Sequence, residues 1–257
     1  MPSPMPRRNK ISKNRYLFRR VAQLAVLAGG AGILSGCQAI VNSTPQSQIR
    51  IIDTSPDAPG LDIYEGSTAL AYNLGFGTLT SYIPLAPGPY TIAADTAGSK
   101  QALTSSKVTL VAATQYTVLI GNAAASLQQL ILQDQSQAAP TGQISLRFID
   151  QATRIGPVDV YLVPAGQKLT AVTPLLSGVV FNTNTGYLNI PNGTYTLVMV
   201  TAGTIPTSTT VATYTGAQVT YPAGSARTII LIDQQLVTSP GLQVLTADDY
   251  DSPTATV

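Results

Sequence analysis

The chain has 257 residues, with 14 basic and 12 acidic side chains, one cysteine, no tryptophan and no histidine. Because no imidazole is available, the composition excludes a Ser-His-Asp triad, a Cys-His dyad and a histidine-ligated metal. The formal charge of +2 hides an uneven distribution, since seven basic residues lie within the first twenty positions and all twelve acidic residues lie at Asp53 or beyond.

The first 36 residues have the features of a secretory signal peptide. A basic segment ending at Arg20 precedes an apolar stretch from Val21 to Leu34. This stretch has fourteen residues, fewer than the roughly twenty that a membrane-spanning helix needs. The residues that close it, Leu34-Ser35-Gly36-Cys37, resemble the bacterial lipobox, in which the cysteine is acylated and the peptide is cut before it. The sequence therefore predicts a lipoprotein with a signal peptide over residues 1–36 and a palmitate-bearing membrane anchor at Cys37.

Residues after the anchor indicate where the mature protein resides. From Cys37 onward the chain has seven basic and twelve acidic residues, a net charge of −5. Gln38 replaces the Asp that retains lipoproteins in the inner membrane of many Gram-negative bacteria, so resemblance to that sorting rule implies the outer membrane. Two arginine pairs lack the complete twin-arginine pattern, which favours ordinary Sec export. Residues 37–48 are mostly polar and predict a flexible tether.

An internal repeat defines the domain organisation beyond the tether. Ile49–Tyr64 aligns with residues 146–161 at an offset of 97, and Arg50/Arg147 is one of its identical pairs. Further matches follow in the same order at offsets of 105 (Tyr82/Tyr187), 111 (Thr117/Thr228) and 115 (Leu127/Leu242). This order predicts a duplicated domain, with repeats over 49–134 and 143–248, a linker over 135–142 and a disordered tail over 249–257.

Each repeat is rich in strand signals. Val, Ile, Thr and Tyr alternate with small or polar residues in segments such as 61–64, 90–94 and 116–120, and again at 158–162 and 228–232. With some seven short strands in each repeat, the pattern predicts an all-β chain of two tandem immunoglobulin-like β-sandwich domains. Leu127–Asp134 is the one segment open to a helical interpretation, and a final strand is favoured there.

The opening of the first repeat resembles a known bacterial family. Ile49–Tyr64 resembles the Val-Arg-Val-x-His-x-Ser-Pro-Asp-Ala-Pro-x-Val-Asp-Val-Tyr signature of domain of unknown function 4397, and Pro84–Ile92 resembles the family's Leu-x-Ala-Gly-x-Tyr segment. Asp53 stands where the family usually has His, and residues 152–156 of the second repeat depart from Ser-Pro-Asp-Ala-Pro. The resemblance implies an extracytoplasmic β-sandwich, often in tandem and attached to the cell envelope, with no established biochemistry.

Five carboxylates are the candidate ligand or turn residues: Asp53, Asp57, Asp62, Asp150 and Asp159. Paired carboxylates can hydrolyse glycosides and oxygen ligands can hold Ca²⁺. The spacing matches no known calcium loop, and the second repeat keeps only Asp150 and Asp159. We therefore expect Asp62 and Asp159 to accept backbone N–H bonds from the preceding turn, and we predict no catalytic residue, metal or cofactor, with a structural calcium ion as the open alternative.

Two functional interpretations remain at this point. The favoured one is a non-enzymatic, lipid-anchored envelope protein that acts as a structural or interaction module, with the membrane and envelope proteins as partners. The alternative is a glycan-binding, or less readily glycan-cleaving, periplasmic or surface accessory, because eleven of the twelve tyrosines follow the anchor and aromatic rings on a sheet can stack on sugars. Nucleic acid is not expected as a partner, because the scattered basic residues form no phosphate-tracking stripe.

Overall fold

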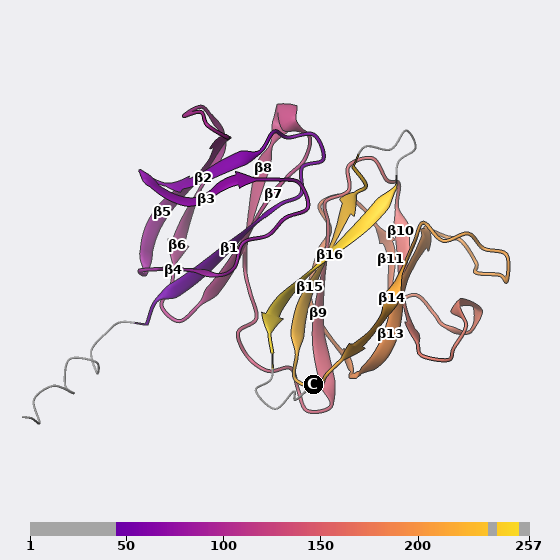
Figure 1. The fold of residues 1–257 in the computed structure, drawn as a ribbon. Coiled ribbons are helices and arrows are strands. Elements are labelled where there is room, and N and C mark those ends of the chain that lie inside the picture. The colour runs from indigo at the N-terminus through magenta and orange to yellow at the C-terminus, as the bar shows by residue number, and fades with distance from the viewer. Residues whose placement is uncertain (1–44, 236–240, 252–257) are drawn as a thin grey trace, which may run out of the picture. The chain divides into compact units, whose positions relative to one another are not determined.

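The computed structural model describes residues 45–235 and 241–251, which fold mainly into strands (Figure 1). The first repeat contains eight strands: β1 (Ser47–Asp53), β2 (Leu61–Glu65), β3 (Thr68–Leu74), β4 (Ile83–Leu85), β5 (Gly88–Thr96), β6 (Ala102–Leu110), β7 (Gln115–Gly121) and β8 (Gln128–Gln133). The second also contains eight: β9 (Gln143–Asp150), β10 (Val158–Pro164), β11 (Leu176–Val179), β12 (Asn184–Pro191), β13 (Gly193–Thr201), β14 (Tyr214–Tyr221), β15 (Ala226–Asp233) and β16 (Leu242–Tyr250). Two short 3-10 helices, Ala124–Ser126 and Leu169–Ala171, complete the described elements.

Each repeat is a β-sandwich of two four-stranded sheets. In the first repeat the sheet orders are β4-β1-β7-β8 and β3-β2-β5-β6, and in the second they are β12-β9-β15-β16 and β11-β10-β13-β14. β1 runs parallel to β7, as β9 does to β15, and the other strand pairs are antiparallel. The prediction of two tandem β-sandwiches is therefore confirmed, with eight strands in each where some seven were expected.

The inner faces of the two sheets in each sandwich form its core. In the first repeat Leu61 and Ile63 alternate inward from β2 and are fully buried beside Ile92 and Val118. The equivalent core of the second repeat centres on Phe148, Val160 and Met199. Burying a side chain of this size contributes about 1.5–3 kcal/mol to stability. The predicted orientation of Leu61 and Ile63 is confirmed.

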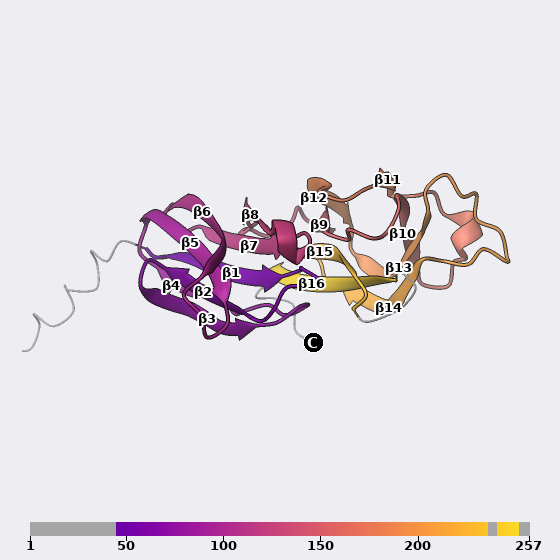
Figure 2. The same cartoon turned by 90° about the horizontal axis from the view of Figure 1, so that it is seen from above.

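Four central strands are buried on both faces. β1 and β7 direct Ile52 and Leu119 away from their own core, and β9 and β15 do the same with Ile149 and Ile230. These side chains form a third apolar cluster that joins the two sandwiches, together with Ile232, Ala247 and partly buried neighbours. Both sandwiches accordingly belong to one compact unit that begins at Pro45 (Figure 2).

The ends of the repeats differ in detail from the expected boundaries. β1 begins at Ser47, so the last residues of the predicted tether belong to the first strand. β16 continues to Tyr250 and buries Asp249, so residues 249 and 250 belong to a strand and not to the predicted tail, because strand pairing with β15 holds them. β8 confirms a final strand in the first repeat. The signal peptide and Cys37 lie outside the described residues, and none of the helices within those residues is long and apolar enough to cross a membrane.

Candidate functional site

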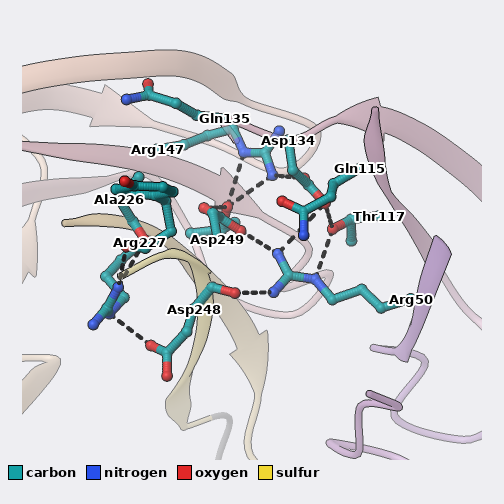
Figure 3. Close-up of polar contacts among 12 residues, drawn as sticks. Arg50, Gln115, Thr117, Asp134, Gln135, Arg147, Ala226, Arg227, Asp248 and Asp249 are labelled. Atoms are coloured by element: carbon teal, nitrogen blue, oxygen red, sulfur yellow. Dashed lines mark hydrogen bonds and ion pairs between the residues drawn. The ribbon is translucent and has the colours of Figure 1, made fainter. Parts of the chain in front are cut away.

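Two equivalent arginines reach from one repeat to the other. Arg50, on β1, forms a buried ion pair with Asp249 on β16, and Arg147, on β9, pairs with Asp134 just after β8 at 2.5 Å (Figure 3). Each guanidinium also donates to a backbone carbonyl of the other repeat, at Asp248 for Arg50 and at Gln133 for Arg147. The two arginine side chains are only 2–3% exposed, so both ion pairs are shielded from water.

Each carboxylate collects hydroxyl donors from its own repeat. Asp134 accepts from Tyr82 at 2.8 Å and from Thr117 at 2.6 Å. Asp249 accepts equivalently from Tyr187 at 2.9 Å and Thr228 at 2.7 Å. A buried ion pair is stabilising only when its remaining hydrogen-bonding capacity is met, and these hydroxyls supply that.

The arginines are held in place by the same tyrosines and threonines. The Arg50 guanidinium lies over the Tyr82 ring, 4.8 Å from its centre, and Arg147 lies 4.7 Å from the centre of Tyr187. Nε of each arginine donates to the threonine hydroxyl of its own repeat, Thr117 or Thr228. Each of these ring and Nε contacts thus has a counterpart in the other repeat. We name this set the reciprocal network: Arg50, Tyr82, Thr117, Asp134, Arg147, Tyr187, Thr228 and Asp249.

Burial and charge shift the pKa values of several residues of the network. Burial alone would lower the pKa of Arg50, but the carboxylates of Asp249 and Asp134 raise it above its ordinary value. Burial, followed by the nearby carboxylates, raises the pKa of the Tyr82 and Tyr187 hydroxyls well above their ordinary range. Both tyrosines therefore remain protonated donors at physiological pH, and Arg50 remains a cation.

Asp62 and Asp159 tie strands to turns. Asp62 accepts the backbone N–H groups of Asn73 and Gly98, at 2.8 and 2.9 Å. Asp159 accepts those of Gly178 and Gly203 at the same distances. The expected backbone donors are present, but they come from β3, β11 and the β5–β6 and β13–β14 connections, not from the preceding turn. Both carboxylates are consequently occupied in holding their own sheets.

Asp53 and Asp150 are buried at the ends of β1 and β9. Each accepts one backbone N–H two residues on, from Ser55 at 2.9 Å or Ala152 at 2.8 Å. Burial raises the pKa of Asp53 to about 7 and that of Asp150 to about 6, against an ordinary value of 3.8. The Oδ2 atom of Asp53 has no hydrogen-bond partner among the described residues.

In each repeat one carboxylate connects two loops, those after β1 and β7 in the first repeat and those after β9 and β15 in the second. In the first, Asp57 is exposed and accepts the N–H of Ala124 from the loop after β7. In the second, Asp233 at the end of β15 accepts the N–H groups of Thr153 and Arg154. The carboxylate thus comes from the opposite loop in the second repeat, whose residues 152–156 do not keep the Ser-Pro-Asp-Ala-Pro sequence. Pro56, Asp57 and Ala123 of the first repeat and Thr153 and Arg154 of the second together line a hollow of about 370 Å³.

The five candidate carboxylates are thus distributed and do not form one centre. Within residues 45–235 and 241–251, no three acidic or cysteine side chains come together as a metal site. The interpretation from sequence also overlooked Asp134 and Asp249, which carry the reciprocal network. Their separation is 115 residues, the offset that already relates Leu127 to Leu242, so the internal repeat contained the signal.

Comparison with known proteins shows to which family the chain belongs. No curated protein matches the chain. Among solved structures, the chain is similar to the carbohydrate-binding module CBMbc (family CBM26) from Eubacterium rectale Amy13K, solved in complex with maltoheptaose, at 8% identity and a TM-score of 0.23, covering 81% of this chain and 98% of that one. It is also similar to the Bacillus anthracis TIE protein at 9% identity and a TM-score of 0.22, covering 79% of this chain and 44% of that one. A family model described as domain of unknown function (DUF4397) matches residues 47–161 and 165–257, in keeping with two tandem repeats. Since these segments make up most of the sequence, the chain belongs to the DUF4397 family.

Proposed function

We propose that this protein is a non-enzymatic, lipid-anchored structural module of the bacterial cell envelope, in which the two sandwiches act as one rigid body. The observation that carries the proposal is the reciprocal network. Two crossed ion pairs, each buried and supplied with hydroxyl donors, fix the orientation of one repeat against the other. A flexible pair of domains would not need such a contact, whereas a spacer or scaffold does.

The apolar part of the same interface supports this role. Ile52, Leu119, Ile149 and Ile230 are each at most 1% exposed although they point away from their own sandwich cores. Interfaces between domains that move are more polar than this. The apolar cluster provides affinity, and the charged network provides a single orientation, because any rotation would leave buried charges unpaired.

The anchoring part of the proposal rests on the Leu34-Ser35-Gly36-Cys37 segment and on Gln38. An acylated Cys37 would attach the rigid body to a membrane permanently, since each buried CH₂ contributes about 0.8 kcal/mol. We place the protein in the outer membrane of a Gram-negative cell. Labelled palmitate should enter the wild-type protein and not the Cys37→Ser variant, which should also keep its uncleaved signal peptide. Label incorporated into Cys37→Ser would contradict the assignment.

Rigidity can be tested by measuring the distance between the repeats. Thr109→Cys on β6 and Gln218→Cys on β14 place two spin labels on exposed positions, and the one native cysteine is the acylation site. Double electron–electron resonance should give a single narrow distance distribution. Adding Asp134→Ala and Asp249→Ala should broaden it. A broad distribution without these two substitutions would contradict the proposed rigid body.

A further inference from the structure

The β3-β2-β5-β6 sheet of the first repeat, which we call its outer sheet, carries an aromatic pair that is open to solvent. Tyr64 on β2 is half-buried, and Tyr72 on β3 is 71% exposed. Their ring centres lie 6.3 Å apart with the planes at 87°. The ammonium of Lys100 lies 5.1 Å from the centre of the Tyr64 ring. An exposed aromatic surface next to a cation is suited to a ligand with an apolar ring face and a negative charge.

The same surface is closed in the second repeat. Tyr161, the counterpart of Tyr64, is 2% exposed and packs with Val163, Val198 and Val200. Leu169 and Val172 cover this cluster from the connection between β10 and β11, which has eleven residues where the β2–β3 connection has two. The duplicated fold can thus bury this tyrosine, and the first repeat does not.

The cross-strand pairs next to Tyr64 and Tyr161 also differ between the two repeats. Val200 pairs with Asp159 across β13 and β10, whereas the equivalent partner of Asp62 on β5 is Asp95. A carboxylate there removes the apolar surface that a covering loop would need. The Oδ1 atom of Asp95 is buried and has no hydrogen-bond partner among the described residues. The first-repeat surface is therefore built as a polar and aromatic face.

Charge gives this face its ligand preference. All four described arginines engage carboxylates, and the described lysines are Lys100, Lys107 and Lys168. None of the three forms an ion pair with a described residue, and two of them, Lys100 and Lys107, lie on the first-repeat surface. Lys107 lines an open hollow of about 520 Å³ together with Glu65, the residue after Tyr64. Glu65 in the hollow and the buried Asp62 and Asp95 near Tyr64 offset part of this positive charge. An anionic ligand would therefore be held by direct contact with the two exposed ammonium groups.

We propose that the outer sheet of the first repeat binds an anionic polysaccharide, with the face of a uronate ring against Tyr72 and ring carboxylates on Lys100 and Lys107. The occupant is a glycan because the tyrosines offer ring faces for pyranose C–H groups. This binding is separate from the rigid-body function and does not depend on it.

The test uses the full-length lipidated protein in detergent micelles and affinity electrophoresis in gels that contain polygalacturonate or alginate. Fully methyl-esterified polygalacturonate is the matched polymer, since it has the same rings without the charge. The variants are Tyr72→Ala and the pair Lys100→Gln with Lys107→Gln, and Lys168→Gln in the second repeat is the control. Melting temperatures of the variants should equal that of the wild type, because the altered side chains are exposed.

We expect at least one uronate polymer to retard the wild-type protein and the esterified polymer to bind at least about tenfold more weakly, a factor that corresponds to about 1.4 kcal/mol. Tyr72→Ala and the double lysine variant should each weaken binding by at least about fivefold, and Lys168→Gln should not. The proposal is overturned if neither uronate polymer retards the protein, if the esterified polymer binds equally, or if the tyrosine and lysine variants bind like the wild type.

Discussion

Arg50 on the first strand of one repeat forms a buried ion pair with Asp249 on the last strand of the other. The equivalent pair, Arg147 with Asp134, runs in the opposite direction across the same interface. Such self-complementarity, in which residue i meets j and j meets i, is the property of a two-fold symmetric dimer interface. Here the two partners are consecutive repeats of one chain, so duplication has placed a dimer-like contact within a single molecule.

Removal of one member of the reciprocal network should lower the free energy of unfolding. Arg50→Ala leaves Asp249 buried without its cation, and we expect a loss of about 3–5 kcal/mol in the free energy of unfolding. Chemical denaturation followed by circular dichroism measures this. Arg50→Met combined with Asp249→Leu should lose less than Arg50→Ala, because no unpaired charge remains.

A partly exposed ion pair supplies the control. Arg154, whose side chain is 40% exposed, lies 3.6 Å from the buried carboxylate of Asp233. That carboxylate keeps the N–H groups of Thr153 and Arg154 as donors when the guanidinium is removed, so Arg154→Ala should reduce the free energy of unfolding by at most about 1 kcal/mol. Equal losses for Arg50→Ala and Arg154→Ala would show that the reciprocal network contributes no more than a surface contact.

The apolar cluster makes a separate prediction. Leu119 points from β7 into the interface, whereas its neighbour Val118 points into the core of the first sandwich. Leu119→Ala should reduce the free energy of unfolding by about 2–5 kcal/mol, the range for deletion of a buried leucine side chain. An exposed leucine would lose far less, so a change below about 1 kcal/mol in denaturant unfolding would argue against a closed interface.

Asp53 should make stability fall as the pH rises. Its pKa is raised to about 7 in the folded state from an ordinary 3.8, so between these values the folded protein holds a proton that the unfolded chain has released. Stability therefore declines through this window and is level above it. Asp53→Asn has no proton to lose and keeps an acceptor for the N–H of Ser55.

Melting temperatures at about pH 4.5 and about pH 8 measure the effect. Asp53→Asn should match the wild type at the lower pH and be more stable at the higher one. A residual slope is expected from Asp150, whose pKa is raised to about 6, and Asp53→Asn with Asp150→Asn should remove most of it. A variant that gains nothing at the higher pH would refute the assignment to Asp53.

The sequence was sufficient to predict the β-sandwich class and the duplication, because strand periodicity and repeat offsets are local properties of the chain. Leu61 and Ile63 alternate with Asp62 and Tyr64 and proved to be core residues. The backbone-accepting role of Asp62 was also predictable, but its donors were not. Pairing of β2 with β3 and β5 determines which N–H groups lie nearby, and that pairing is set by long-range contacts.

The reciprocal network could not be predicted in the same way. A single arginine between isoleucines, as in Ile49-Arg50-Ile51, is typical of a strand with one solvated face. Only the second repeat, packed against that face, makes the position a buried one. The runs Val118-Leu119-Ile120 and Ile229–Ile232 did carry a sign of burial on both faces, since they lack polar alternation.

The most direct test of the rigid two-repeat body is to cut the connection between its halves. A protease site inserted between Gln137 and Ala138, which are exposed, allows cleavage after folding, and the only cysteine precedes both repeats, so no disulfide links them. Size-exclusion chromatography with light scattering should then show both fragments in one particle of unchanged mass, and Arg50→Ala with Arg147→Ala should release them. Separation of the wild-type fragments at micromolar concentration would contradict the account.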